Sequence, residues 1–337
     1  MNSDRPKIIL TGGAGYIGSH ILLKLRQLSY DVIVIDDFSN SSPKTWEDIQ
    51  EFTGESISLI EGSVCDADVL DQCCSDFFGA TVIHCAGLKS PSESETEPLK
   101  YYSENVGGAI NLISAMEKNG CKKLIFSSSA SVYGDTDQVP VDESSLPSPK
   151  SVYAKTKYMV EQICEDWSKA SEDRSCVSLR YFNPIGADDS GVIGEKPKQI
   201  VNNLMPHILT AATGVTQGVT IFGSDYDTRD GTGERDYIHV VDLAEAHIKS
   251  LEYIETSKGY ENINIGTGSG VTVLELIHEF EKATSVKVPH TFSNRRIGDI
   301  DRSIASVEKA KRKLNWEAKF DVAEMCRSAW QWHRSLA

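Results

Sequence analysis

The stretch Lys7-Ile-Ile-Leu-Thr-Gly-Gly-Ala-Gly-Tyr-Ile-Gly18 decides the fold of this chain. A short apolar run leads into a glycine cluster, and residues 19–25 continue with helical periodicity, so the order is strand, turn and helix. The glycines form a G-x-x-G-x-x-G pattern. We expect Gly12 to permit a tight turn, Gly15 to let main-chain amides approach a pyrophosphate at the helix N-terminus, and Gly18 to permit close helix packing.

A carboxylate ends the next predicted strand, which runs from Asp31 to Asp36. Asp36 stands 18 residues after Gly18, where an acid in this arrangement accepts hydrogen bonds from the ribose hydroxyls of adenosine. Its charge would repel a 2'-phosphate, which favours NAD over NADP. The order of strand, glycines, helix, strand and acid therefore predicts a dinucleotide site with NAD as its cofactor.

Strand and helix patterns alternate along the rest of the chain. This alternation predicts an α/β fold, with a doubly wound parallel sheet of the Rossmann-like type and a smaller C-terminal α/β domain for the substrate. We expect residues 1–182 to form the NAD-binding domain, with about 237–265 returning to its core, and 183–337 to form most of the discontinuous substrate domain. The expected further strands are 57–61, 81–85, 123–127 and 176–181, and the expected helices are 66–76, 99–118 and 153–170.

Composition narrows the class of protein. The 337 residues are 40% hydrophobic, which is typical of a globular enzyme, and the net charge of -15 argues against nucleic acid or an anionic membrane as a partner. No apolar run approaches the ~20 residues of a membrane span, and the N-terminus has no signal-peptide core, so we expect a cytoplasmic protein. Eight cysteines without a C-x-x-C pair indicate free thiols, and the histidine spacing indicates no metal site.

A tyrosine and a lysine one helical turn apart are the candidate catalytic pair. Tyr153 and Lys157 lie at i and i+4, so both side chains share one helix face. An ammonium group favours a neighbouring phenolate, and lowering a phenol pKa by ~3 units requires ~4 kcal/mol. With the help of a cationic cofactor ring, Tyr153 is expected to act as a general base tuned by Lys157. Ser129 ends a predicted strand nearby and is expected to donate a hydrogen bond to the same substrate oxygen.

A set of longer motifs resembles one known family. The motifs are Thr-Gly-Gly-Ala-Gly-Tyr-Ile-Gly-Ser-His20, Ala-Gly-Leu-Lys89, Ser-Ser-Ser-Ala-Ser-Val-Tyr-Gly134, Tyr153-x-x-x-Lys157, Arg180-Tyr-Phe-Asn-Pro-Ile-Gly186, Asn202-Asn-Leu-Met-Pro206 and Asp230-Gly-Thr-Gly-Glu-Arg-Asp-Tyr-Ile-His-Val240. Together they resemble the UDP-glucose (UDP-galactose) 4-epimerases of the extended short-chain dehydrogenase/reductase superfamily. The resemblance runs from Lys7 to about Trp332, and the last three motifs are not needed by a generic dehydrogenase of the superfamily.

The resemblance implies a reaction at C4 of a UDP-bound sugar. Tyr153 would remove the proton of the 4-hydroxyl while C4 passes a hydride to tightly held NAD. The 4-keto sugar would then turn over and receive the hydride on its other face, so UDP-galactose and UDP-glucose interconvert without net oxidation. Lys157 would also bind the nicotinamide ribose. The family further implies a homodimer formed through helices of the first domain.

The resemblance also assigns binding residues by matching motif. Arginines suit a diphosphate because the guanidinium is a fixed fork of donors that stays charged. For the substrate, the implied residues are Ser131, Asn183, Asn203, Leu204, Phe222, Arg235, Arg296, Asp299 and Ser303. For NAD, they are Gly12, Gly15, Tyr16, Ile17, Gly18, Asp36, Asn40, Ser41, Ser63, Val64, Ala86, Gly87, Lys89, Asn105 and Phe182.

Two positions depart from the family pattern. Ser63 stands where the family usually has an acid near the adenine, and a serine hydrogen-bonds less strongly there. Ser303 stands where some members carry a bulky aromatic residue, and a small residue leaves room at C2 of the sugar, so N-acetylhexosamine nucleotides become possible substrates.

Other functions stay open at this point. The sequence also allows another UDP-sugar pair, such as glucuronate/galacturonate or xylose/arabinose, or a net NAD-dependent sugar-nucleotide dehydrogenase. The non-enzyme alternative is an NAD-binding regulatory protein, whose usual sign is loss of Tyr153, Lys157 or Ser129, and all three are present. Dehydration is disfavoured because Ala130 occupies the position where an additional acid would handle a second proton.

Overall fold

A seven-stranded parallel sheet forms the larger layer of the protein. The computed structural model describes residues 6–136, 138–196, 203–296 and 299–336. The strand order is β10-β6-β5-β4-β1-β2-β3, so the direction of winding reverses between β1 and β4. In sheets of this kind, ligands bind outside the carboxyl ends of the strands at such a switch point. The strands are β1 (Lys7–Thr11), β2 (Asp31–Asp36), β3 (Ser58–Glu61), β4 (Thr81–His84), β5 (Lys123–Ser129), β6 (Ser175–Tyr181) and β10 (Gly259–Ile265).

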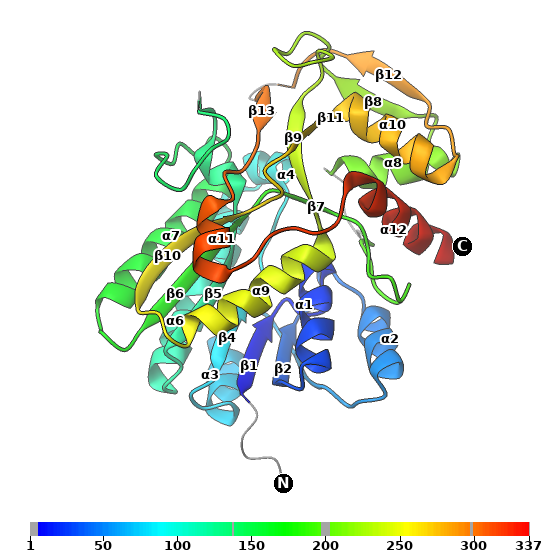
Figure 1. Cartoon of the computed structure of the whole chain (residues 1–337). Helices are drawn as coiled ribbons and strands as arrows, with labels where there is room; N and C mark the ends of the chain where they lie inside the picture. The colour runs from blue at the N-terminus through cyan, green and yellow to red at the C-terminus, as the bar shows by residue number, and fades with distance from the viewer. Residues whose placement is uncertain (1–5, 137, 197–202, 297–298, 337) are drawn as a thin grey trace.

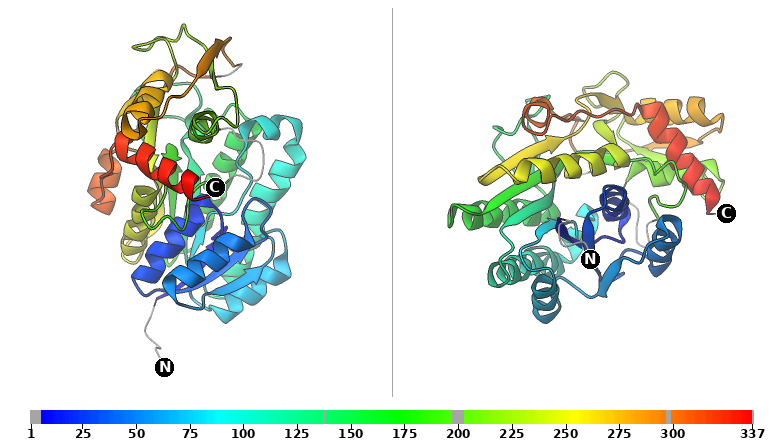
Figure 2. Two further views of the ribbon diagram at one scale, coloured as in Figure 1. Left: turned by 90° about the vertical axis from the view of Figure 1, so that its right-hand side faces the viewer. Right: turned by 60° about the horizontal axis from the view of Figure 1, so that its bottom comes forward.

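Alternating side chains of the strands pack against helices on both faces of this sheet (Figures 1 and 2). Ile8 and Leu10 belong to one apolar cluster with residues of α1 (Tyr16–Gln27) and α9 (Val240–Ile254). Ile9, between them, belongs to a second cluster with residues of α3 (Ala67–Asp76), α6 (Gly108–Lys118) and α7 (Val152–Lys169). A strand buried on both faces reads as a continuous apolar run, as this one does. The predicted doubly wound α/β fold is confirmed. The helix α2 (Pro43–Thr53) follows β2.

The single helix expected over 99–118 is interrupted. Helix α5 (Pro98–Tyr101) is followed by a π-helical segment, Tyr102–Gly107, and only then by α6. Gly108, the first residue of α6, packs closely against Val64, because a Cβ there would lie 2.7 Å from Cγ2 of that residue. π-Helical turns often occur at functional sites, and this one carries Asn105. The short helix α4 (Pro91–Thr96) precedes α5.

A smaller α/β layer lies above the carboxyl ends of the large sheet in the view of Figure 1. Its main sheet has the order β11-β9-β13, with β7 also paired to β9, and β8 pairs with β12. The strands are β7 (Asn183–Ile185), β8 (Val219–Phe222), β9 (Glu234–His239), β11 (Gly270–Thr272), β12 (His290–Ser293) and β13 (Arg302–Ser303). The helices are α8 (Leu204–Ala212), α10 (Val273–Thr284) and α12 (Val322–Ser335). Helix α11 (Glu308–Leu314) comes between the last two in sequence but packs against α9 and β10 of the larger layer (Figure 1).

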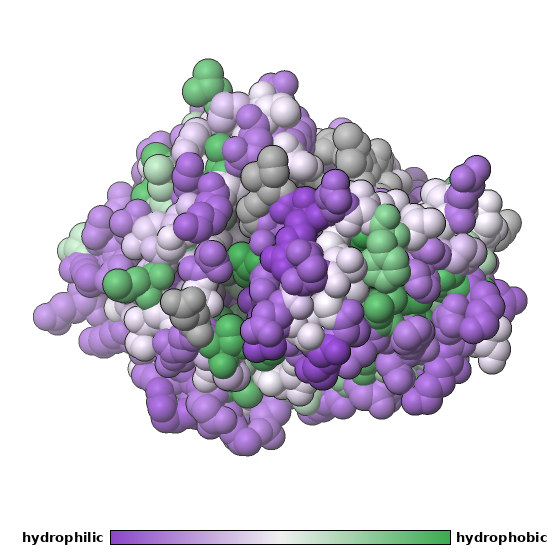
Figure 3. Space-filling view, turned by 90° about the horizontal axis from the view of Figure 1, so that it is seen from above, coloured by the Kyte–Doolittle hydropathy of each residue, from purple (hydrophilic) through white to green (hydrophobic). Residues whose placement is uncertain are grey.

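The face that carries this smaller layer is largely hydrophilic where its side chains are drawn in colour, with hydrophobic residues in small separate groups (Figure 3). With a net charge of -15, long-range electrostatics repel an anionic substrate. Recognition of such a substrate therefore depends on cations placed locally in the site. In the described part of the chain, no helix is both long and apolar enough to cross a membrane.

Candidate active site

The glycine turn has the geometry that the sequence predicts. Gly12 has a φ of +71°, and its amide donates to the main-chain oxygen of Ile35 at 2.8 Å. A Cβ at Gly12 would lie 2.7 Å from the amide nitrogen of Ala86, so the turn packs against the loop after β4. A Cβ at Gly18 would lie 2.0 Å from the oxygen of Gly12. The close approach that requires Gly18 is therefore to the turn itself, and Gly15 follows as the N-cap of α1.

Asp36 is fixed beside the N-terminus of α1. Its carboxylate accepts hydrogen bonds from the amides of Ala14 at 2.9 Å and Phe38 at 3.0 Å, and from the hydroxyl of Ser41 at 2.6 Å. The side chain is buried. These donors hold the acid at the end of β2 and draw the loop with Ser41 towards it, so a predicted cofactor residue also shapes the site.

The loop after β4 is held by an amide side chain. Asn105 accepts a hydrogen bond from the amide of Leu88 at 2.8 Å and donates to the oxygen of the same residue at 3.1 Å. It also donates to Oγ1 of Thr156 on α7 at 3.0 Å. Asn105 thus braces the segment that contains Ala86, Gly87 and Lys89. The sequence did not predict this bracing role.

A small, partly open pocket lies at the N-terminus of α1. Its volume is about 30 Å³. Residues far apart in sequence line it, so the fold brings the glycine turn together with the loops after β2 and β4. Several of its lining residues are predicted cofactor residues, namely Gly15, Tyr16, Asn40, Ser41 and Lys89. Residues 194–196 line the other side.

The other predicted cofactor residues are spread around this centre. Ile17 lies in the first turn of α1 and is partly exposed. The hydroxyl of Ser63 accepts a hydrogen bond from the amide of Cys65 at 3.1 Å. Val64 is buried, and Phe182 is buried in a cluster with Val132.

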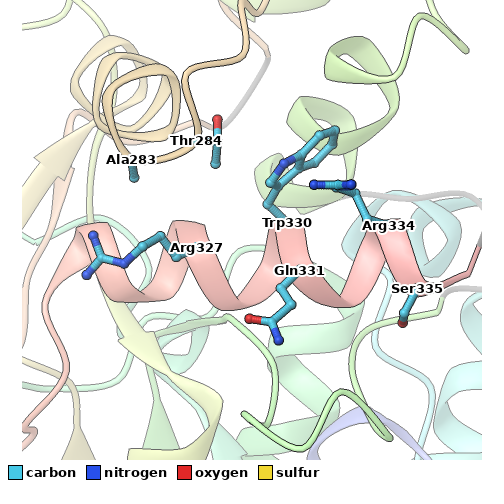
Figure 4. A pocket seen from close by; sticks show the side chains of 7 residues that line it. All are labelled: Ala283, Thr284, Arg327, Trp330, Gln331, Arg334 and Ser335. Carbon is cyan, nitrogen blue, oxygen red and sulfur yellow. The ribbon is translucent and has the colours of Figure 1, made fainter.

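A larger surface hollow of about 420 Å³ lies elsewhere, between α10 and α12 (Figure 4). Ala283 and Thr284 approach it from α10, while Arg327, Trp330 and Arg334 project from α12. None of its lining residues is a predicted site residue, so size alone does not identify the site.

The candidate base stands at the start of α7. The hydroxyl of Ser151 accepts a hydrogen bond from the amide of Ala154 at 3.1 Å and caps the helix. The amide of Tyr153 donates to the buried hydroxyl of Ser94 in α4 at 3.0 Å. Two elements therefore fix the position of Tyr153, and Ser94 was not found from the sequence because a lone serine in a polar stretch carries no signal.

Lys157 is buried against β5. Its ammonium group donates to the main-chain oxygen of Ser127 at 2.8 Å. It lies 4.9 Å from the ring centroid of Phe126 and 6.0 Å from that of Tyr153. Burial lowers the pKa of Lys157 to about 8, and the nearby Cys85 and Glu161 oppose this change.

The pKa of Tyr153 is set mainly by burial. Burial raises it above its usual value, and the hydrogen bond with Ser129 acts in the opposite direction. The expected lowering requires Lys157 together with a cationic cofactor ring, and it stays a prediction, because desolvation of the phenolate outweighs the protein's own groups. The hydroxyl of Ser129 in turn accepts from Oγ of Ser131 at 2.9 Å. Tyr153, Ser129 and Ser131 thus form one hydrogen-bonded group at the end of β5.

Two buried polar networks support this group. Arg180 forms an ion pair with Glu161 on α7, at 2.6 Å between Nη2 and Oε2, and the hydroxyl of Ser128 donates to the same carboxylate. The hydroxyl of Tyr181 donates to Oγ of Ser127 at 2.7 Å and is hydrogen-bonded to His247. Both networks tie β5 to its neighbours just below Ser129.

Several predicted substrate residues gather in the smaller layer. The guanidinium of Arg235 pairs with Asp299 at 2.6 Å, and that of Arg296 lies 4.0 Å over the ring centroid of Phe222. Ser303 pairs in register with Arg235 across β13 and β9. The adjacent strand β7 carries Asn183, which donates to the main-chain oxygen of Asp236 at 2.9 Å.

The remaining predicted substrate residues stand at the start of α8. Asn203 is its N-cap and Leu204 its first residue. Asn203 donates to the carboxylate of Glu195 at 3.1 Å. Asn202, which begins this motif, lies outside the described residues. Glu195 was missed from the sequence because its partners are distant along the chain.

A glycine turn at the switch point of a doubly wound sheet, with a tyrosine, a lysine and a serine at the neighbouring strand end, defines a Rossmann-like enzyme of the short-chain dehydrogenase/reductase class. Comparison with known proteins gives the family. The NAD dependent epimerase/dehydratase family matches residues 8–266, and the chain belongs to that family.

Individual relatives match almost the whole chain. The UDP-glucose 4-epimerase of Bacillus subtilis (strain 168) is 46% identical over 328 residues, covering 97% of each chain. UDP-glucose 4-epimerase 2 of Arabidopsis thaliana is 44% identical over 329 residues, covering 96% of this chain and 94% of the relative.

Solved structures agree. The UDP-glucose 4-epimerase of Stenotrophomonas maltophila, with bound NAD and formylated UDP-arabinopyranose, matches with a TM-score of 0.96 and 41% identity, covering 98% of this chain and 99% of that one. The Bifidobacterium longum enzyme in complex with NAD+ and UDP matches with a TM-score of 0.93 and 39% identity, covering 98% of each chain.

Proposed function

We propose that this protein interconverts UDP-galactose and UDP-glucose by reversible oxidation at C4 of the sugar. The observation that carries the proposal is the group formed by Tyr153, Ser129 and Ser131 at the end of β5, next to the buried ammonium of Lys157. Full-length identity of 46% to a UDP-glucose 4-epimerase supports the same reaction.

The residues at the switch point fit NAD as the cofactor. The N-terminus of α1 offers main-chain amides to a pyrophosphate, and Lys89 adds a positive charge to the same cavity. The carboxylate of Asp36 lies beside the turn, where it suits ribose hydroxyls and repels a 2'-phosphate. NAD, when bound, supplies the hydride acceptor and donor for the reaction at C4.

The chain's own residues handle the proton. Tyr153 takes the proton of the 4-hydroxyl when the sugar is oxidised and returns it when the 4-keto group is reduced. Ser129 donates a hydrogen bond to the same oxygen and so holds C4 in place. The buried charge of Lys157 stabilises the phenolate form of Tyr153, because little water screens it there.

The smaller layer is proposed to hold the UDP group. Arg235 and Arg296 offer planar donors to the diphosphate, and the pairing with Asp299 orients Arg235. Arg296 already stacks on Phe222, so its guanidinium is preordered. Asn183, Asn203 and Leu204 complete the predicted set.

Ser303 favours a second substrate class. It stands opposite Arg235 at the edge of the second sheet, and its small side chain leaves room for an N-acetyl group at C2. We propose that UDP-N-acetylgalactosamine and UDP-N-acetylglucosamine are also accepted. A structural relative from Campylobacter jejuni, 32% identical, is described as a UDP-Glc/GlcNAc 4-epimerase.

A homodimer is part of the proposal. Leu99 on α5, Ile110 on α6 and Met159 on α7 are exposed by 82%, 47% and 40%. A second copy would cover these apolar side chains by a two-fold contact between helices of the first domain. The domain division near residue 182 and the cytoplasmic location stay predictions.

The test is turnover without added cofactor. Purified protein is incubated with UDP-galactose alone, and the nucleotide sugars are separated. We expect UDP-glucose to form, and Tyr153→Phe to lower the rate at least ~100-fold while bound NAD is unchanged. Unchanged turnover in Tyr153→Phe would refute the assigned base, and accumulation of NADH with an oxidised sugar would favour a net dehydrogenase.

A further inference from the structure

We infer that Glu195 latches a strap, residues 186–196, over the pyrophosphate end of the cofactor site and thereby slows the release of NAD. The inference rests on the proposed NAD site and goes beyond it, because it assigns a retention function to a residue outside the predicted cofactor set. The strap follows β7 and precedes α8, both of the smaller layer, and its contacts with α1 bring it against the larger layer.

The strap is anchored at both ends of its course. The hydroxyl of Tyr16 donates to the main-chain oxygen of Gly186 at 2.7 Å, which ties the first turn of α1 to the start of the strap. Ile193 is fully buried in the apolar cluster that contains α1. Gly194 fits closely against Trp332, because a Cβ there would lie 2.2 Å from Cδ1 of the indole ring. These contacts fix where the next residue, Glu195, is placed.

Glu195 joins a cofactor residue to a substrate residue. Its Oε1 atom lies 3.4 Å from the ammonium nitrogen of Lys89 and accepts a hydrogen bond from Nδ2 of Asn203 at 3.1 Å. The Glu195 side chain is only 10% exposed, whereas that of Lys89 is 49% exposed. The carboxylate therefore lies in the wall of the pocket. Burial raises the pKa of Tyr16 well above its usual value, and the charge of Glu195 adds to this effect.

The pocket is too small for a pyrophosphate to pass while Glu195 contacts Lys89 and Asn203. The pocket between the N-terminus of α1, Lys89 and residues 194–196 has a volume of about 30 Å³. A single water needs roughly 10–15 Å³ of such volume, so the space admits about two waters. Passage of a dinucleotide therefore requires residues 194–196 to lift, which breaks both contacts of Glu195.

The charges explain why one residue controls this step. A carboxylate near a pyrophosphate is repulsive unless a cation compensates it, and Lys89 provides that cation. Removing the charge of Glu195 weakens its contacts with Lys89 and Asn203, because an amide oxygen accepts a hydrogen bond less strongly than a carboxylate does. The strap then keeps its Tyr16, Ile193 and Trp332 anchors, while the two contacts across the pocket are weaker.

The experiment measures exchange of bound NAD. Holoenzyme is mixed with excess deuterium-labelled NAD, and samples are desalted at intervals and denatured. Mass spectrometry then gives the fraction of the released cofactor that carries the label. We expect Glu195→Gln to speed exchange about tenfold, which corresponds to ~1.4 kcal/mol. When this variant is diluted, NAD should dissociate and turnover should fall, and added NAD should restore most of that turnover.

The matched control is Asp189→Asn on the same strap. It removes one negative charge from an exposed position and should leave exchange at the wild-type rate. Exchange in Glu195→Gln at or below the wild-type rate, or equal acceleration in Asp189→Asn, would overturn the latch. The glutamine is nearly isosteric, and its thermal unfolding is compared with wild type so that misfolding is recognised as a separate effect.

Failure of the latch and failure of the proposed function give different results. A wild-type protein that neither carries NAD nor converts UDP-galactose overturns the proposed function and the latch with it. A wild-type protein that does both, beside a Glu195→Gln variant with wild-type exchange, overturns the latch alone.

Discussion

The ammonium group of Lys157 lies 2.8 Å from the main-chain oxygen of Ser127 and 6.0 Å from the ring centroid of Tyr153. The strand β5, rather than the phenol, therefore holds the lysine in place. Lys157 influences Tyr153 through its charge and not through a direct hydrogen bond. Because Lys157 is buried and Tyr153 is half-buried on the same face of α7, that charge is weakly screened.

Replacing this charge should change the pH dependence of the reaction. In Lys157→Met the phenolate of Tyr153 loses its nearest cation, so its pKa rises further. We expect the rising limb of the kcat profile to move to higher pH by about one unit or more, and turnover at pH 7 to fall roughly 100-fold. Lys155→Met, exposed on the same helix, should keep the wild-type profile. A Lys157→Met profile that superimposes on wild type would remove the electrostatic role.

The glycine turn should not tolerate one added methyl group. In Gly18→Ala the Cβ meets the oxygen of Gly12 at 2.0 Å, so the turn has to open. We expect a loss of about 1–3 kcal/mol in the free energy of unfolding and at least a tenfold fall in NAD content after purification. Gly107→Ala is the control, because its φ of -59° is helical and an added Cβ would lie 4.0 Å from the main-chain oxygen of Tyr102. Equal NAD content in the two variants would show that the turn does not hold the cofactor.

Buried histidines should make the protein labile to mild acid. Burial lowers the pKa of His247 to about 4 and that of His84 to about 3. The unfolded chain, in which histidine has its usual pKa near ~6.5, binds more protons across this window. The contribution of these histidines to the free energy of unfolding is therefore full above pH 6.5 and is lost as the pH drops towards 4. For His247 the loss is about 3 kcal/mol.

Denaturant unfolding at a series of pH values checks this dependence. We expect His247→Gln to be less stable at pH 7 and to have a shallower slope between pH 4 and 6.5. His278→Gln, at an exposed position of α10, should keep the full slope. If the wild-type stability is flat through this range, the account of the buried histidines is wrong.

The residue at 303 should control substrate size. In Ser303→Tyr an aromatic ring stands opposite Arg235, where the register of β13 and β9 places it. We expect turnover of UDP-N-acetylgalactosamine to fall at least ~10-fold while UDP-galactose is converted at a rate within a few-fold of wild type. If wild type turns over UDP-galactose and not the N-acetyl sugar, the size argument fails at once. Ser306→Thr, at a serine that follows β13 in sequence, serves as the control.

The sequence was sufficient where local order carries the information. The glycines, Asp36 and the alternation of Ile8, Ile9 and Leu10 between two faces follow from spacing along a few residues. The π-helical segment Tyr102–Gly107 was not predicted, because the periodicity of residues 99–118 indicates one continuous helix.

Contacts between distant segments explain the other differences. Lys89 and Glu195 are 106 positions apart, and no motif links them. The pKa of Tyr153 depends on how much water the folded protein removes from the phenol, which spacing on one helix cannot supply. The sequence therefore predicted which residues gather at the switch point better than it predicted how they are held there.

The most direct test of the central claim follows the hydrogen at C4. UDP-galactose labelled with deuterium at C4 is converted in ordinary water, and the UDP-glucose formed is analysed by mass spectrometry and NMR. If oxidation at C4 is reversed within the closed site, the deuterium returns to C4 of the product and is fully retained. Loss of the label to solvent would contradict reversible oxidation at C4. Retention of the label would also contradict it if the bond between the sugar and UDP is cleaved during the conversion.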